Sequence, residues 1–232
     1  MKKSWTALVV ILTIATPLLA ATPRTLQGEV PATGLEIVRL DAGVGDIDVV
    51  AVDTADLVTV EVQLKARRGG FFSSLKKAQR EVDEAELRMD ISKGVLRLEI
   101  ETESDDRHFE ERWILGLPAH LDFDLDLGVG DVDIRGLAGT LTADIGVGDL
   151  TAEAVSGSIS IDIGVGDATV KAAAVDYGSV DGSGGVGNAE LMVRGRKISS
   201  SGFVGASTEW TGEGPHSIEI SAGVGDAKVT LE

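Results

Sequence analysis

Cysteine is absent from this chain of 232 residues, and aromatic residues make up only 4% of it. The absence of cysteine excludes a disulfide framework, thiol catalysis and zinc sites built on thiolates, and it leaves no residue that could carry a lipoprotein anchor. The scarcity of aromatic side chains favours a thin core of small branched side chains over a large globular one.

Basic residues are also scarce. The chain has 21 Lys and Arg residues against 38 Asp and Glu residues, which gives a formal net charge of −17 at pH 7. A protein with this charge is repelled at long range by nucleic acid and by anionic lipid. We therefore expect no nucleic-acid partner, and we expect charged partners to be cationic.

Long hydrophobic runs are missing after the first 21 residues, and those residues have the three parts of a secretory signal. Lys2 and Lys3 precede an apolar run that starts at Trp5, and Pro17-Leu-Leu-Ala-Ala21 follows it. The run is about 12 residues long, whereas a membrane-spanning helix needs roughly 20. We predict that residues 1–21 are a cleaved signal peptide and that the protein is exported to the periplasm or cell surface. An uncleaved membrane anchor is the alternative.

Glycine, in contrast, is abundant, with 29 residues, and much of it lies in a repeated Gly-Val-Gly-Asp motif. Three copies are spaced 18 residues apart, at Gly128–Asp131, Gly146–Asp149 and Gly164–Asp167. Intact copies also stand at Gly43–Asp46 and Gly223–Asp226, and altered copies at Gly185–Asn188 and Phe203–Ala206. A short fixed period predicts that one structural unit is stacked many times.

Each motif copy separates two runs of alternating apolar residues. Leu125, Leu127 and Val129 alternate before the Gly-Asp step, and Val132 and Ile134 alternate on the opposite parity after it. Period two predicts strands with one buried face. The parity change predicts a corner, where glycine supplies a positive φ and aspartate accepts backbone hydrogen bonds. We predict an all-β fold, a parallel β-solenoid with coils of about 18 residues. Its corner valines, Val129, Val147 and Val165, are expected to face inward.

The rest of the chain is predicted to be organised around this stack. Residues 22–33 are predicted to form a linker, and residues 34–232 a single β-solenoid domain whose main repeat stack covers about 121–232. An insert at about 66–112 separates the first motif copy from the others. Its apolar spacing predicts a helix over Ser73–Glu86, followed by a β-hairpin.

Four features of the sequence together resemble the bacterial adhesin family whose β-repeat fold is called the toast rack. They are the early motif at Gly43–Asp46, the insert with its helix and hairpin, the strand that contains Pro118, and the run of motifs from Gly128 onward. The resemblance covers nearly the whole chain after the signal. It implies an exported or envelope-exposed domain without catalytic residues, of a kind sometimes linked to membrane-stress systems.

Two sets of aspartates recur with the motif and would form columns if the repeats stack. One set stands two residues before the first motif glycine, and the other set ends the motif. The residues are Asp126, Asp144 and Asp162 in the first set and Asp131, Asp149 and Asp167 in the second, with Asp41 and Asp46 in the equivalent places of the first copy. Carboxylates about 5 Å apart repel one another, and a bound calcium ion would relieve the repulsion. Calcium is the only cofactor that the sequence suggests. The alternative is that the motif aspartates accept amide hydrogen bonds and the other set is solvated.

Basic residues that follow the signal form one cluster, which lies within the insert. The cluster consists of Arg67, Arg68, Lys76, Lys77 and Arg80, and it includes Phe71 and Phe72. It suits a peripheral contact with anionic lipid head groups or with an acidic column of another copy. The two phenylalanines suit shallow insertion into a membrane or a partner. The alternative is an ordinary solvated helix face and loop.

Catalytic motifs are lacking. Ser73-x-x-Lys76 matches the serine–lysine pair of penicillin-interacting enzymes in letters only, because the accompanying S-D-N and K-T-G motifs are missing. Parallel β-helix polysaccharide lyases have a comparable architecture, but their coils are longer and carry loops that wall a groove. We therefore predict that the protein is not an enzyme.

We predict a non-enzymatic envelope or surface interaction module, adhesin-like or part of a membrane-stress scaffold, whose partner is an envelope protein or a surface polymer. The second candidate is a calcium-stabilised structural or adhesive β-solenoid, and the third is a carbohydrate-active β-helix enzyme. Calcium titration separates the first two. A groove lined by acidic and basic side chains would favour the third.

Overall fold

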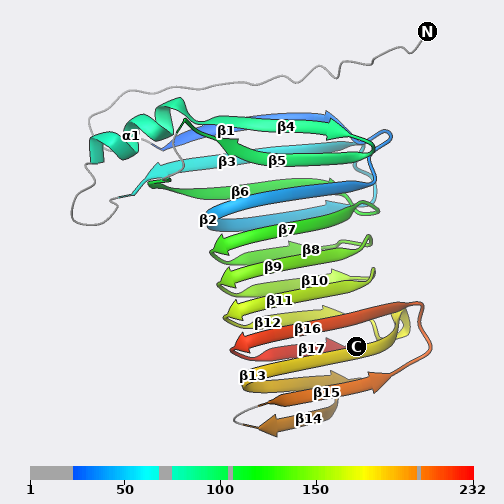
Figure 1. Ribbon diagram of the computed structural model, residues 1–232. Coiled ribbons are helices and arrows are strands. Elements are labelled where there is room, and N and C mark those ends of the chain that lie inside the picture. Colours follow the sequence, from blue (N-terminus) through cyan, green and yellow to red (C-terminus); the bar gives the residue numbers. More distant parts are fainter. Residues whose placement is uncertain (1–22, 68–74, 104–106, 203–204) are drawn as a thin grey trace.

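The computed structural model describes residues 23–67, 75–103, 107–202 and 205–232, which form an almost entirely β structure (Figure 1). These residues contain seventeen strands, one α-helix and one short 3-10 helix. In chain order the elements are β1 (Arg24–Pro31), β2 (Ile37–Val52), β3 (Leu57–Ala66), α1 (Leu75–Glu84), β4 (Glu86–Ser92), β5 (Val95–Glu101), β6 (Phe109–Pro118), β7 (Asp122–Val129), β8 (Val132–Arg135), β9 (Leu141–Val147), β10 (Leu150–Val155), β11 (Ile159–Val165), β12 (Ala168–Ala172), η1 (Ala174–Asp176), β13 (Tyr177–Val193), β14 (Arg196–Gly202), β15 (Ala206–Thr211), β16 (His216–Val224) and β17 (Ala227–Leu231). The prediction of an all-β fold is confirmed.

The strands form two rows of hydrogen-bonded neighbours. Row A consists of β1, β3, β6, β2, β8, β10, β12, β17, β13 and β14. Row B consists of β4, β5, β2, β7, β9, β11, β16, β13 and β15. Strands β2 and β13 belong to both rows because each passes through a motif corner in its middle. Figure 1 shows the rows running from the end that carries α1 to the end that carries β14 and β15.

Within the repeats, neighbouring strands are parallel and a residue pairs with the one 18 places further along the chain, as Asp131 does with Asp149. Asp144 lies opposite Asp162 in row B, and Leu150 lies opposite Ala168 in row A. The first motif copy stacks directly on the second despite the insert between them, since Val44 pairs with Val129. The motif corners therefore lie over one another, as their spacing predicts.

The last motif copy does not lie at the end of the stack. Strand β16 pairs with both β11 and β13, and β17 pairs with both β12 and β13. In Figure 1 these red strands lie below the yellow-green strands β11 and β12 and above β13. Beyond β13 the neighbours β14 and β15 run antiparallel, so the parallel stacking ends there.

The interior of the repeats consists of columns of small apolar side chains. Leu125, Ala143, Ile161 and Ile220 form a column in row B, and Val132, Leu150, Ala168 and Ala227 form one in row A. All eight side chains are buried. Removal of apolar surface from water is worth about 25 cal/mol per Å², so these columns supply the main favourable term in folding. The predicted core of small branched side chains is confirmed for the repeats.

The prediction that the corner valines face inward is wrong. Val129 is 44% exposed, and Val147 and Val165 are each 47% exposed. The inward alternation of row B ends one residue before the motif, at Leu127 in the second copy. The chain then turns through Gly130, whose φ is +150°, and this turn places the intervening valine at the outer apex of the corner.

The prediction of a linker at residues 22–33 is also wrong, because this segment contains strand β1. It pairs antiparallel with β3, and Leu26 and Val30 are buried. Gly28 stands between them on the same face and hides the alternation. A Cβ there would lie 2.3 Å from the sulfur of Met89, so a larger residue would require the Met89 side chain to move.

The insert has the predicted elements. Helix α1 lies within the predicted range and packs through Ala78 and Val82, and β4 and β5 form the antiparallel hairpin. The guanidinium of Arg24 donates hydrogen bonds of 2.7–3.0 Å to the carbonyl oxygens of Val82, Asp83 and Ala85. These bonds cap the end of α1 and join it to the first strand.

No helix in the described ranges is long and apolar enough to cross a membrane.

Candidate functional site

The stacked motif corners form a column of exposed valines along one edge of the molecule. Consecutive members pair in register between neighbouring strands. In spatial order the valine column consists of Val44, Val129, Val147, Val165, Val224 and Val186. The last five are 43–49% exposed, and Val44 is half-buried. Each valine stands between two motif glycines, so no neighbouring side chain within its own corner covers it.

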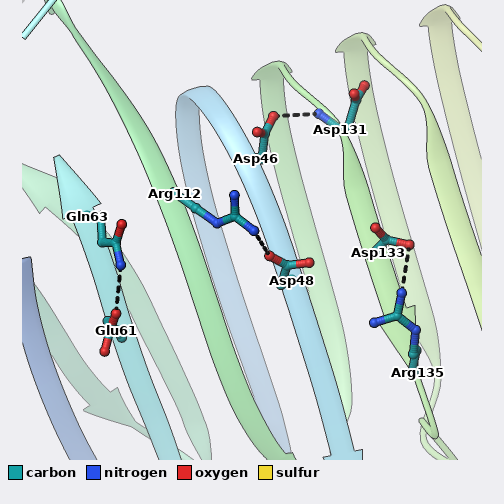
Figure 2. Close-up of polar contacts among 8 residues, drawn as sticks. All are labelled: Asp46, Asp48, Glu61, Gln63, Arg112, Asp131, Asp133 and Arg135. Atoms are coloured by element: carbon teal, nitrogen blue, oxygen red, sulfur yellow. Dashed lines mark hydrogen bonds and ion pairs between the residues drawn. The ribbon is translucent and has the colours of Figure 1, made fainter. Parts of the chain in front are cut away.

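A column of carboxylates follows the valines on the row A side. This closing-Asp column consists of Asp46, Asp131, Asp149, Asp167 and Asp226 and ends at Asn188. The Oδ1 atom of each aspartate accepts a hydrogen bond from the backbone N–H of the next member, at 3.4, 3.1, 2.8, 2.7 and 2.7 Å in that order. Figure 2 shows the first of these bonds, from Asp131 to Asp46.

These hydrogen bonds give the motif aspartate a structural role. The sequence alternative, in which the carboxylate accepts amide hydrogen bonds, is what the structure shows. The donor, however, lies in the next repeat and not in the same turn. Each bond therefore joins two repeats, and a charged acceptor makes it stronger than a neutral one. Asn188 ends the column, and its Nδ2 donates back to Asp226 Oδ1 at 3.0 Å.

A second column of carboxylates lies on the row B side of the valines. This outer-Asp column consists of Asp41, Asp126, Asp144 and Asp162, which are partners in register and exposed. Ser221 and Ser183 continue it. In the described ranges no group of three or more His, Cys, Asp or Glu side chains is arranged to hold a metal ion. Calcium binding by these columns stays a prediction.

Charge is distributed unequally over the two rows. In row A, carboxylates pair with neighbouring bases, as Asp48 does with Arg112 at 2.9 Å and Asp133 with Arg135 at 3.4 Å (Figure 2). In row B, Arg39 pairs with Asp124 near the insert, but β7, β9, β11, β15 and β16 contain no Lys or Arg. The same five strands carry Asp122, Asp124, Asp126, Asp144, Asp162, Glu209 and Glu219. On these five strands, the row B side of the valine column therefore carries acidic side chains without Lys or Arg.

The predicted basic cluster lies only partly in the described residues. Lys76, Lys77 and Arg80 are exposed on α1, and Lys77 Nζ lies 3.7 Å from a carboxylate oxygen of Glu81. Arg67 is exposed just after β3. Arg68, Phe71 and Phe72 lie outside the described residues. The structure thus places three of the predicted bases together on one helix.

Two buried carboxylates beneath the insert were not singled out from the sequence. Glu81 of α1 accepts a hydrogen bond from the backbone N–H of His108 at 3.0 Å and fastens the helix to the start of β6. Glu111 is 2% exposed, and its Oε2 accepts a hydrogen bond of 2.8 Å from Trp113 Nε1. The sequence does indicate that Glu111 is buried, because the alternation along β6 places it on the same inward face as Phe109 and Trp113.

Burial raises the pKa of the Glu111 carboxyl above its ordinary value of 4.5. The folded state therefore holds this proton more tightly than the unfolded state. We expect wild type to lose stability relative to Glu111→Gln as pH rises from about 4.5 through the raised pKa, and the difference to become constant above it. Urea unfolding at several pH values measures this difference. Glu110→Gln removes a charge from the other side of the same strand and controls for net charge. A Glu111→Gln difference that does not vary with pH would contradict the expectation.

Comparison with known proteins supports the fold of this chain but identifies no family for it. No family model and no curated protein matches this chain. The chain is similar to the solved structure of a candidate cell adhesion protein from Clostridium sporogenes, with 20% identity and a TM-score of 0.60 over 91% of this chain and 100% of that one. Two Parabacteroides distasonis structures, a candidate lipid-binding protein and a candidate adhesin, match at 11% and 12% identity with TM-scores of 0.29 and 0.27, each over 90% of this chain and 97% of the other. Only the first likeness is strong enough to support the fold.

Proposed function

We propose that this protein is an exported, non-enzymatic surface module that binds a partner through the stacked corners of its repeats, in the manner of an adhesin. The observation that carries this proposal is the valine column, in which five consecutive apolar side chains are 43–49% exposed along one edge. Exposed apolar side chains that are contiguous, and not scattered singly, mark interaction surfaces. The name of the Clostridium sporogenes structure, a candidate cell adhesion protein, agrees with such a role.

The proposal includes an architecture and a location. The parallel repeats are proposed to form a β-solenoid of the toast-rack type, a rigid rod that presents one corner per repeat. Residues 1–21 are proposed to direct export and to be removed. The basic cluster of Arg67, Arg68, Lys76, Lys77 and Arg80, with Phe71 and Phe72, is proposed as a second, peripheral contact with the membrane or a partner.

Export and envelope association can be tested with the full chain carrying a C-terminal tag in a bacterial host that has a periplasm. We expect an N-terminus near residue 22, digestion of the protein by proteinase K added to spheroplasts, and sedimentation of the purified mature chain with envelope vesicles. A chain that lacks residues 2–21 is the control and should remain in the cytoplasm. An uncut N-terminus in the cytoplasmic fraction, or no sedimentation with the vesicles, would contradict the proposal.

A further inference from the structure

We propose that the valine column, together with the closing-Asp and outer-Asp columns on either side of it, is a docking edge for a basic amphipathic α-helix of an envelope partner. This inference rests on the proposed surface function and names the chemistry of the partner. The apolar stripe of the helix would cover the valines, and its flanking Lys and Arg side chains would pair with the two columns of carboxylates.

The dimensions of the edge suit a helix. Parallel strands lie about 4.8 Å apart, so the six members of the valine column extend over about 24 Å. A helix of about 16 residues has this length. Its apolar stripe recurs about every 5.4 Å, close to the separation of successive valines.

The charge of the two carboxylate columns determines which charge the partner helix must carry. The outer-Asp column lies on one side of the valines and the closing-Asp column on the other, as Asp126 and Asp131 do for Val129. A neutral or acidic helix would leave these carboxylates desolvated or opposed to like charge, whereas a basic helix would pair with them. Anionic lipid is disfavoured for the same reason.

The backbone of the corner excludes an extended peptide that adds a strand. Carbonyl oxygens of the valine column already accept hydrogen bonds from the neighbouring repeat, as Val147 does from Gly130 at 3.0 Å and Val165 from Gly148 at 2.9 Å. A partner must therefore bind through side chains alone. A helix fits this condition because its own backbone groups are paired within it.

A second copy of the chain is the less favourable occupant. Two valine columns placed against each other would bring the carboxylate columns of the two copies close together, which is unfavourable. Helix α1 carries Lys76, Lys77 and Arg80, but its apolar residues Ala78 and Val82 are buried against its own chain. Leu75 is its one exposed apolar residue, at 38%, and a single leucine does not make an apolar stripe long enough to cover the valine column.

The probe for this proposal is a fluorescein-labelled peptide of 16 lysines and leucines with one leucine face, titrated by anisotropy against the purified mature protein. In one variant Val129, Val147 and Val165 are changed to Thr, which keeps the β-branched shape but removes apolar surface. We expect this variant to bind about tenfold more weakly, equivalent to about 1.4 kcal/mol. In a second variant Asp126, Asp144 and Asp162 are changed to Asn, and we expect several-fold weaker binding with a smaller salt dependence.

The matched control changes Val50 and Val52, which are 45% and 46% exposed in row A, to Thr. It should bind as wild type does, and melting curves should show that all three variants fold. Equal binding of a scrambled peptide of the same composition, or wild-type affinity in the Val→Thr variant, would overturn the proposal. Dimers or binding to neutral phosphatidylcholine vesicles that depend on these valines would instead assign the edge to a second copy or to lipid, and would overturn it too. If wild type sediments with envelope vesicles and the Val→Thr variant does not, while the labelled peptide and its scrambled form bind wild type equally, this inference falls and the proposed function stands.

Discussion

Gly148→Ala is expected to destabilise the protein by about 5 kcal/mol or more, enough to prevent folding in many proteins of this size. The φ of Gly148 is +149°, and a Cβ there would lie 1.8 Å from the backbone oxygen of Gly130 in the neighbouring repeat. The obstacle is backbone, which is itself hydrogen-bonded in the stack and cannot move aside without separating two repeats. Circular dichroism and urea unfolding of the purified variant measure the loss.

The matched control is Gly195→Ala, in the turn between β13 and β14. Gly195 has a φ of +74°, but a Cβ there would meet nothing within 4 Å. Only the conformational cost applies, about 1–2 kcal/mol. If the two variants lose similar stability, the close approach of the corners is not what requires glycine in the motif.

Replacing Asp131, Asp149 and Asp167 together with Ala is expected to reduce the free energy of unfolding by about 3 kcal/mol, about 1 kcal/mol for each hydrogen bond between repeats. The amides of Asp149, Asp167 and Asp226 would lose their carboxylate acceptors. Replacement of the same three residues with Asn keeps an oxygen at each position and removes adjacent like charges. We expect the Asn variant to stay close to wild type in urea unfolding. An Asn variant as unstable as the Ala variant would contradict the role given to these bonds.

Wild type and the Asn variant together also test whether the columns bind calcium. If the columns hold calcium, millimolar calcium raises the melting temperature of wild type above its value in a chelator, and the Asn variant loses this response because a divalent ion prefers charged oxygen ligands. A wild-type melting curve that calcium leaves unchanged would remove the calcium prediction and leave the hydrogen-bonding role intact.

The regular part of the fold was predictable because its period and its chemistry coincide. Alternation around residues such as Ile145 and Leu150 identifies the buried faces, and the 18-residue spacing identifies which residues become neighbours. Helix α1 and the β4–β5 hairpin follow from local patterns of the same kind. The hydrogen-bonding role of the motif aspartates was one of the two alternatives that the sequence left open.

The predictions that were wrong depend on three-dimensional geometry that the pattern of residues does not contain. Period two cannot tell where an inner face ends, so Val147 was assigned to the core although it stands at the apex of the corner. A glycine interrupts the alternation of β1, and the side chain of Met89, a residue distant in sequence, occupies the space beside Gly28. The candidate docking edge was missed for the first of these reasons, because it consists of the misassigned valines.

Strands β16 and β17 lie between the repeat of β11 and β12 and strand β13, and this position affects how the chain folds. The repeats from β7 to β12 are joined across 18 residues, and the first motif copy is joined to the second across 85. The repeat of β16 and β17 is joined to Asp167 across 59 residues and to Asn188 across 38. Distant pairings of this kind form slowly. As the chain is made from its N-terminus, the repeats from β7 to β12 can therefore form as they emerge, but β13 cannot join the stack until β16 and β17 have emerged and paired with β11 and β12.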